Sequence, residues 1–575
     1  MKGDGDKLKI DKLLINGKIY TSDPKNPWAE ALAILGKKLA YVGDNETAKA
    51  MAEEGTEIVD LEGKTVIPGI IDGHTQPVTV AKTHYRVRMP LTHDKDELLA
   101  NIKKYAEANP KEEKPYFFCE NYFAEVFGPE GPKKEVLDEI VSDRPARIQD
   151  FTDHACWYNS MALEMLKDEN GIPQADSPLG FSEFVKDENG EYTGWCKESG
   201  PEGDHGIYEA IGWYPPENAD EEMIKPLLDF FKAHGVTCMM DGFTEGEESM
   251  RMFYELDKAG KLGMYYEGTS ICGTIDDLED AIAVVKDWKE KYTSEHVGIN
   301  TIKIFIDGTN ELGDCLSLEP FHNDPEGKNC GEANMYKDDL VKAFTRCNEE
   351  GIDLHLHIIC DGAFRNVVDA LEESRKICGD DWKIYVTGAH CELTHPDDRK
   401  RAAELGMFID WSTHWTGGYF GEAAQEFHGI DRWNTMYDFR EFTANGGLLG
   451  FSSDVFSYQE AVRANPFFGI QTAMTRVDPM MPLDPEKYPG SIRQPEGAKY
   501  SLEELLKGYT INNAIRMRLQ DKMGSLEAGK LANFMVLNKD IFEVAPEDML
   551  TVDVEYTYFD GEKRTIKSDL TITRE

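Results

Sequence analysis

Five residues that can bind a divalent metal or carry a proton lie in or directly after apolar, strand-like runs. The runs are "GIIDGH", "TIKIFIDG", "LHLHII", "IYVTGAH" and "GFSSD", and the residues are His74, Lys303, His357, His390 and Asp454. Imidazole, carboxylate and a modified lysine that converge at one place would form a site for a divalent metal. Such a metal could lower the pKa of a bound water and polarise a carbonyl.

Strand alternation sharpens this hypothesis. Because successive side chains of a strand alternate, Lys303 shares a face with Asp307, and His355 shares a face with His357. A lysine inside a fold is costly unless it is paired, neutralised or metal-bound. A second interpretation stays open from the residues alone, since a strand-end histidine is often a hydrogen-bonded core residue. Asp361 could likewise cap the helix that follows it.

These residues need elements that bring strand ends together. Strand-like segments alternate with amphipathic helical stretches, at residues 65–72, 146–151, 235–242, 264–270, 301–308, 353–360, 384–390, 406–412 and 448–454. Alternation over this length favours a parallel α/β fold, with a (β/α)₈ TIM barrel as the leading candidate. In that fold the chemistry lies at the carboxyl ends of the strands. Residues from about 83 to 230 hold too many elements for one crossover, so we interpret them as an inserted lid region.

Both ends of the chain have β character. Asn16-Gly17 and Asp560-Gly561 stand between short apolar runs, which is a hairpin signal. We therefore predict a small β-sandwich domain formed by both termini. Its parts would be residues 1–67 and 511–575, on either side of a barrel of residues 68–510.

Composition limits the partners and the compartment. Asp and Glu outnumber Lys and Arg by 107 to 62, giving a net charge of −45, which disfavours nucleic acid and anionic membranes. No apolar run is long enough to span a bilayer, and the first ten residues lack a signal-peptide core. The 11 cysteines stand singly without a CxxC pair, which favours a reducing cytoplasm over disulfides or a zinc ribbon. We expect a cytoplasmic protein with a small-molecule substrate, assembled as a homo-oligomer, a dimer.

The order of the motifs resembles the amidohydrolase superfamily, and within it the amidohydrolase 3 branch that includes N-substituted formamide deformylases. The resemblance covers nearly the whole chain and rests on "INGKIYTSD", "PGIIDGH", "RPARIQDFTDHACWYNSMAL", "TIKIFIDG", "HIICDGA", "AHCELTHPDD", "GFSSD" and "GSLEAGKLANFMVLNKD". It implies that the metal ligands are His74, Lys303, His357, His390 and Asp454. In two-metal members the lysine is carbamylated and bridges the ions, and the aspartate also takes a proton from the attacking water.

The resemblance also implies substrate-binding residues in the insertion. Asp153, His154 and Asn159 match one motif near the substrate pocket, and Glu198 matches another. Capping or packing within the insertion explains these four residues equally well.

Gln76 departs from the family pattern, which has histidine at this position. An amide oxygen can still bind a metal, but it is a harder ligand that suits Mn²⁺ better than Zn²⁺. Gln76 could instead hydrogen-bond only to water or substrate. We expect one or two divalent ions, Mn²⁺ or Zn²⁺, with Gln76 as a candidate ligand.

The implied function is that of a metal-dependent hydrolase that cleaves a C–N bond of an amide, formamide or cyclic amide. Asp454, His357 and His390 would be its catalytic residues. An alternative is a Mn²⁺-dependent cyclohydrolase that opens a cyclic 1,3-diketone such as dihydrophloroglucinol by hydrolytic C–C cleavage. A third reading is a catalytically degenerate relative, which the retention of Lys303 and the other predicted ligands disfavours.

Overall fold

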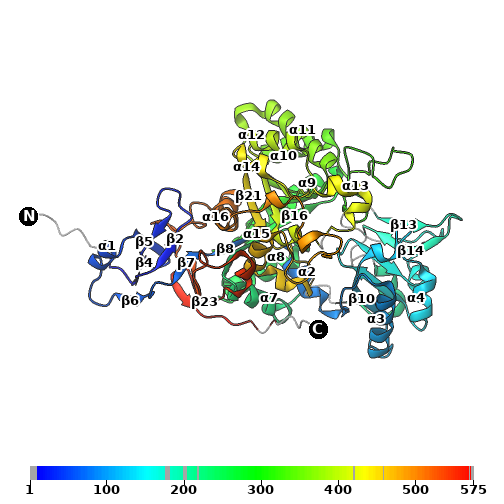
Figure 1. The fold of residues 1–575 in the computed structure, drawn as a ribbon, viewed down its shortest axis with the longest axis horizontal. Coiled ribbons are helices and arrows are strands. Elements are labelled where there is room, and N and C mark those ends of the chain that lie inside the picture. Colours follow the sequence, from blue (N-terminus) through cyan, green and yellow to red (C-terminus); the bar gives the residue numbers. More distant parts are fainter. Residues whose placement is uncertain are drawn as a thin grey trace, which may run out of the picture.

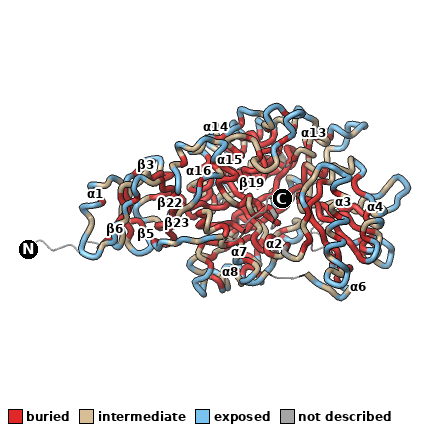
Figure 2. Tube along the Cα trace, turned by 60° about the horizontal axis from the view of Figure 1, so that its bottom comes forward, coloured by how far each residue is buried: buried red, intermediate tan, exposed pale blue. Residues whose placement is uncertain are grey.

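The protein is described by a computed structural model, which covers residues 9–174, 182–198, 204–215, 219–418, 421–457, 459–568 and 570. The molecule is elongated (Figure 1), with a barrel at its centre, the terminal β-strands at one end and the insertion at the other. Buried segments lie in all three parts (Figure 2), so each part has a core of its own. Within the described ranges, no helix combines the length and apolar character that a membrane crossing requires.

Eight neighbouring parallel strands form the barrel and confirm the predicted fold class. In spatial order they are β8 (Ile70–Thr75), β15 (Val236–Asp241), β16 (Tyr265–Cys272), β17 (Val297–Phe305), β18 (Asp353–Ile358), β19 (Val386–His390), β20 (Phe408–Ser412) and β21 (Leu448–Ser452). The helices around them are α7 (Glu221–Ala233), α8 (Gly246–Lys258), α9 (Leu278–Tyr292), α10 (Lys337–Glu350), α11 (Asp361–Cys378), α12 (Pro396–Glu404), α13 (Ala424–Trp433), α14 (Arg440–Ala444), α15 (Pro466–Thr475), α16 (Leu502–Lys507) and α17 (Asn513–Arg516).

The helices cover the barrel through apolar faces with helical spacing. On α9 the residues that become buried recur every three or four positions, namely Leu278, Ala281, Ile282, Val285 and Trp288. The outward side chains of β17, including Ile302 and Ile304, join the same core. Their neighbour Lys303 therefore faces the barrel interior, as strand alternation predicts.

Side chains close the seam between β21 and β8. Asn513 donates its amide to the carbonyl oxygens of Ile71 and Phe451, at 2.8 Å each. Gly450 leaves room for this amide, since a Cβ there would lie 2.1 Å from Asn513 Oδ1. The backbone amide of Asp454 also donates to the carbonyl of His74 at 2.7 Å. The barrel thus closes where the first and last strand carry predicted site residues.

Strands from both termini form two sheets that share a core, which confirms the predicted sandwich. One sheet has the order β5-β4-β1-β6 and the other β24-β23-β22-β7-β2-β3. The shared core includes Leu14 and Ile34 from the first sheet and Phe534 from the second. The bounds are β1 (Lys12–Ile15), β2 (Lys18–Tyr20), β3 (Trp28–Ala29), β4 (Ala31–Leu35), β5 (Lys38–Gly43), α1 (Asn45–Ala50), β6 (Glu57–Asp60), β7 (Thr65–Pro68), β22 (Phe534–Leu537), β23 (Val554–Phe559) and β24 (Glu562–Arg564).

Two local expectations at these ends are wrong. The run 65–72 forms two strands in different sheets, because the chain turns from β7 into β8 at Gly69, whose amide donates to the carbonyl of Asn533. The Asn16-Gly17 signal does not form a hairpin either, since β1 pairs with β4 and β6 while β2 pairs with β3 and β7. The Asp560-Gly561 turn does join the antiparallel pair β23 and β24.

The insertion has its own six-stranded sheet, in the order β13-β14-β12-β11-β10-β9. The strand-like segment 146–151 is β11 of this sheet and not a barrel strand. A buried ion pair of 2.8 Å between Arg147 and Asp204 lies beside it. The elements are α2 (Pro77–Lys82), β9 (Val87–Arg88), α3 (Lys95–Ala108), β10 (Phe117–Tyr122), α4 (Lys134–Ile140), β11 (Ala146–Asp150), β12 (Ala155–Tyr158), α5 (Ser160–Met165), β13 (Glu183–Lys186), β14 (Tyr192–Lys197) and α6 (His205–Ile211).

Candidate metal centre

Three predicted ligands converge at the carboxyl ends of the barrel strands. His74 lies near the end of β8, His390 ends β19, and Asp454 follows β21. His74 Nε2 lies 3.5 Å from Asp454 Oδ1, and His390 Nδ1 lies 3.3 Å from Asp454 Oδ2. The three side chains are buried, and one ligand atom of each lies within 4.8 Å of the others.

The backbone is strained at this group. Asp454 has a φ of +44° and His390 a φ of +69°, which is the left-handed region that non-glycine residues rarely adopt. Two predicted substrate-binding residues share this feature, Glu198 with a φ of +51° and Asp153 with +63°. Such conformations cost about 1–3 kcal/mol each and cluster at functional sites. These four candidate residues therefore share an unusual backbone conformation.

The donor set fits a divalent ion. His74 Nε2 is buried and has no hydrogen-bond partner among the described residues. Burial holds the pKa values of His74 and His390 well below the usual range, so both rings are neutral, which is the form that binds metals. Burial raises the pKa of Asp454 to about 6, against the opposing charge of Lys303. Two imidazole nitrogens and a carboxylate are ligands that Zn²⁺ and Mn²⁺ accept.

Lys303 and His357 lie beside these three residues. Lys303 is buried, and burial lowers its pKa to about 8, although Asp454 and Asp410 oppose the shift. Its Nζ lies 4.9 Å from the centre of the Phe305 ring and makes no ion pair within the described part of the chain. The ring of His357 lies 4.6 Å from that of His390, centre to centre. Both side chains therefore border the space next to the three-residue group.

Gln76 contacts the group through its amide. It precedes α2, and its Nε2 donates to Asp454 Oδ1 at 3.1 Å. With this amide orientation, Gln76 fixes one oxygen of the carboxylate.

The insertion places a histidine–carboxylate pair over the barrel mouth. His154 Nδ1 lies 2.8 Å from Glu198 Oε2, and the His154 ring lies 5.8 Å from the His357 ring, centre to centre. Burial would lower the pKa of His154, but the Glu198 carboxylate raises it to about 9. Asp153, next to this pair, accepts a 2.9 Å hydrogen bond from Arg86.

Asn159 does not lie with this pair. Its amide nitrogen donates to the carbonyls of Val141 and Arg144, and its oxygen accepts from the backbone amides of Ala146 and Ala162. It therefore caps α5 and holds the insertion together, as the capping alternative in the sequence allows.

Further buried residues contact His74 or the backbone next to it. His355 Nε2 lies 3.0 Å from His74 Nδ1, which leaves His74 Nε2 directed at Asp454. Arg516 forms a buried 3.0 Å ion pair with Asp410 and donates to the carbonyl of Gly73 at 2.7 Å. A Cβ at Gly73 would lie 2.0 Å from Asp410 Oδ2, so this glycine makes room for the pair.

Only part of this support could be found in the sequence. Strand alternation places His355 on the same face as His357, whereas no local pattern marks Arg516.

The ring of Trp415 stacks on that of His390, with ring centres 5.2 Å apart and planes at 18°.

Comparisons with known proteins identify the family of the chain. The sequence profile of the Amidohydrolase family matches residues 57–563. The chain belongs to the amidohydrolase family. This confirms the predicted family and the predicted hydrolase class.

Similar proteins cover most of the chain. The N-substituted formamide deformylase of Arthrobacter pascens is 25% identical, over 96% of this chain and 97% of that protein. The exoenzymes regulatory protein AepA of Pectobacterium carotovorum subsp. carotovorum is 28% identical, over 73% of this chain and 89% of that protein. The crystal structure of an uncharacterized metal-dependent hydrolase from Pyrococcus horikoshii shares the fold. Its TM-score is 0.64 at 22% identity, and the match covers 93% of this chain and 99% of that one.

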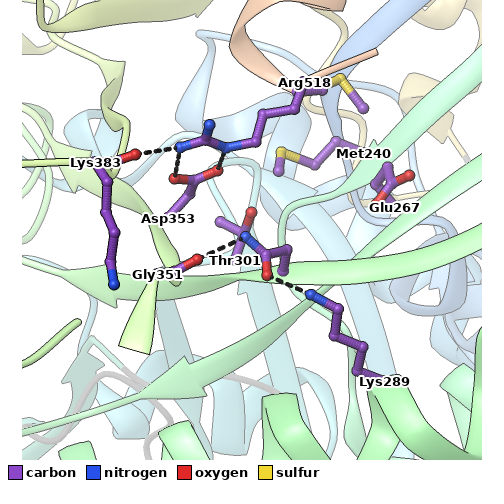
Figure 3. A pocket seen from close by; sticks show the side chains of 10 residues that line it. Met240, Glu267, Lys289, Thr301, Gly351, Asp353, Lys383 and Arg518 are labelled. Atoms are coloured by element: carbon purple, nitrogen blue, oxygen red, sulfur yellow. Dashed lines mark hydrogen bonds and ion pairs between the residues drawn. The ribbon is translucent and has the colours of Figure 1, made fainter. Parts of the chain in front are cut away.

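A different cavity, of about 490 Å³, lies at the amino end of β18 and beside the middle of β17. Arg518 makes a bidentate ion pair with Asp353 there, at 2.6 and 2.8 Å, and also donates to the carbonyl of Lys383. Figure 3 shows these contacts. The described residues that line this cavity include no histidine. Residues at this end of a barrel serve stability, so we place the chemistry at the opposite end.

Proposed function

We propose that this amidohydrolase holds a divalent metal between His74, His390 and Asp454 and hydrolyses the C–N bond of an amide, formamide or cyclic amide. The observation that carries the proposal is the convergence of these three buried donors at the barrel mouth. The likeness to the Arthrobacter formamide deformylase over the whole chain supports the substrate class. Mn²⁺ and Zn²⁺ are the candidate ions.

A metal held at this place would supply a Lewis acid that polarises the substrate carbonyl and makes water more acidic. Asp454 is the residue that accepts the proton of the attacking water. Gln76 fixes one of its oxygens and His390 faces the other, so the carboxylate cannot rotate away from the mouth. Proton transfer to a positioned base contributes about 10²–10⁴-fold to a rate.

His154 is the proton donor of the proposed site. Glu198 fixes its Nδ1 and favours the charged ring, so Nε2 is free to donate to the developing oxyanion or to the leaving nitrogen. A cavity of about 550 Å³ adjoins the pair, and its lining includes Glu198 and Asp314. We propose this cavity as part of the substrate path.

Lys303 is the candidate for carbamylation. With a pKa of about 8, part of the amine is neutral at physiological pH, and only a neutral amine adds to carbon dioxide. His357 lies on the next strand and, with carbamylated Lys303, would provide ligands for a second ion.

A second candidate function rests on Gln76. Because Gln76 stands where the family has histidine and donates to Asp454, the three-residue group is suited to a single ion. One Lewis acid and one proton donor suffice for Mn²⁺-dependent C–C ring opening of a cyclic 1,3-diketone, since the leaving carbanion is an enolate.

The test begins with metal-free protein reloaded with Mn²⁺ or Zn²⁺ and assayed against N-formyl amines, N-acyl amines, cyclic amides and cyclic 1,3-diketones. Hydrolysis of an amide supports the first function, and ring opening of a diketone supports the second. His390→Ala should lose metal and activity, whereas the matched variant His395→Ala, at an exposed helix cap, should keep both. Absence of bound metal and of hydrolysis with either ion would overturn both proposals.

A further inference from the structure

A second group of metal-binding side chains lies outside the proposed centre. Cys315 belongs to the segment after β17, Cys360 precedes α11, and His428 lies on α13. All three are buried, at 0%, 0% and 4% exposure. His428 Nε2 lies 3.9 Å from Cys315 Sγ and 4.0 Å from Cys360 Sγ. Three distant segments of the chain thus present two sulfurs and one nitrogen to a common point.

A fourth donor completes the group. Asn310 Oδ1 lies 2.6 Å from His428 Nε2 and 3.3 Å from Cys315 Sγ. The neighbouring Asp361 also approaches, with Oδ1 3.4 Å from Cys360 Sγ, but Arg432 and the amide of Leu318 already hold its carboxylate. The available set is therefore two thiols, one imidazole and one amide oxygen.

We propose that Cys315, Cys360 and His428 form a second, structural metal site for a thiophilic divalent ion such as Zn²⁺, with Asn310 Oδ1 as the fourth ligand. Zinc binds sulfur at about 2.3 Å and imidazole nitrogen at about 2.0–2.1 Å in a tetrahedral arrangement, which places sulfur and nitrogen ligands about 3.6 Å apart. The distances of 3.9 and 4.0 Å exceed this value by a few tenths of an ångström. Two ligands of one tetrahedral ion lie farther apart than a hydrogen bond, so the 2.6 Å contact between His428 Nε2 and Asn310 Oδ1 would also have to open when the ion binds.

The chemistry of the two sites differs. The His74, His390 and Asp454 group offers nitrogen and oxygen, whereas the cysteine group offers two soft sulfur ligands that select Zn²⁺ over Mn²⁺. Two thiolates neutralise a divalent ion, so the bound group carries no net charge. That matters at a fully buried position, where an unpaired charge is costly.

The second site would stabilise the segments around the barrel mouth. Asp307, at the start of the segment that carries Cys315, accepts hydrogen bonds from the amides of Leu316, Ile359 and Cys360. Asn310 Nδ2 donates to Glu392, two residues after His390, at 2.9 Å. An ion bound to Cys315, Cys360 and His428 would connect this segment to α11 and α13. It would thereby fix the relative positions of the segments that border the barrel mouth.

Cobalt titration tests the site independently of catalysis. Reduced, metal-free protein is titrated with Co²⁺, and the near-ultraviolet charge-transfer band of cobalt thiolate is recorded. Among the candidate metal groups in the described part of the chain, the cysteine group has sulfur ligands and the mouth centre has none, so the band reports on the cysteine group. We expect a saturable band, and we expect it to disappear when Zn²⁺ is added in excess over both proposed sites.

Cysteine variants test whether the band arises from this group. Cys315→Ala/Cys360→Ala should abolish it and lower bound zinc by one equivalent, whereas Cys347→Ala, at a buried cysteine of α10 outside the group, should leave it unchanged. No band in the wild-type protein, or a band that persists in the double variant, would overturn the proposal. Recovery of a Cys315–Cys360 disulfide from protein kept under reductant would also count against it. If the enzyme assays fail but the band is present, the proposed function is wrong and the second metal site is still supported.

Discussion

Asn513→Ala is predicted to open the seam of the barrel and to weaken the metal centre together. The amide of Asn513 is fully buried and is the bridge between the carbonyls of Ile71 on β8 and Phe451 on β21. These strands carry His74 and lead into Asp454. The bridge therefore controls the distance between two proposed metal ligands.

The expected loss follows from two buried carbonyls. A buried polar group left without its partner costs about 1–3 kcal/mol, so the two carbonyls together give a loss of about 2–6 kcal/mol in the free energy of unfolding. Asn512 provides a matched control, because it lies next to Asn513 and donates to one carbonyl only, that of Leu449, at 2.8 Å in a partly buried position. Asn512→Ala should cost about 1 kcal/mol, the net value of a single hydrogen bond.

Denaturant unfolding and Mn²⁺ titration of both variants measure the two effects. Asn513→Ala should unfold at a lower denaturant concentration and bind Mn²⁺ more weakly, whereas Asn512→Ala should keep the affinity of the native protein. If the two variants are equally stable and bind Mn²⁺ equally well, then the seam does not depend on Asn513 and the reasoning is wrong.

Three further predictions concern other parts of the molecule. Glu198→Gln should lower kcat by about 10²-fold with metal content unchanged, because His154 loses the charge that favours its protonated form; an unchanged kcat would exclude His154 as the proton donor. Burial would lower the pKa of His296, but its hydrogen bonds to Asp560 and Asp257 raise it. A histidine whose pKa is higher in the folded than in the unfolded protein stabilises the fold. This contribution to stability is full at a pH below the pKa of the unfolded state and disappears as the pH rises through the pKa of the folded state. His296→Gln should therefore lower the thermal midpoint more at pH 6 than at pH 9, and an equal loss at both would contradict this. Arg518→Ala should cost about 1 kcal/mol in stability, since its pair with Asp353 is partly screened by solvent, and a large loss of activity would contradict its assignment to the stability face.

The sequence predicts the barrel well because barrel strands are buried on both faces. Runs such as "TIKIFIDG" are largely apolar apart from the inward-facing Lys303, and Asp307 follows the strand at its carboxyl end, where the structure places the mouth. The same reasoning fails at 65–72, because the break at Gly69 depends on a contact with Asn533 near the other end of the chain. It also fails at Asn16-Gly17, where the turn signal is local but the pairing of β1 and β2 depends on distant strands.

The candidate site also has features that the sequence predicts and features that only the tertiary structure reveals. Residue type and strand position mark His74, His390 and Asp454 as candidate ligands, because a polar side chain at the end of a buried strand must find a partner or a ligand. The sequence also shows Gln76 as a departure from the family pattern. Its contact with Asp454 depends on strands at opposite ends of the barrel domain, so the tertiary structure alone reveals it.

Local pattern thus determines which segments become strands and which residue types stand at their ends, since burial and alternation act over a few residues. The tertiary structure decides the rest. It decides that Asn513 bridges the seam, that Arg516 supports the centre from beneath, and that Cys315, Cys360 and His428 meet. The physical reason is the same in each case. These contacts join segments far apart in the chain, and nothing in the local sequence of either partner encodes the identity of the other.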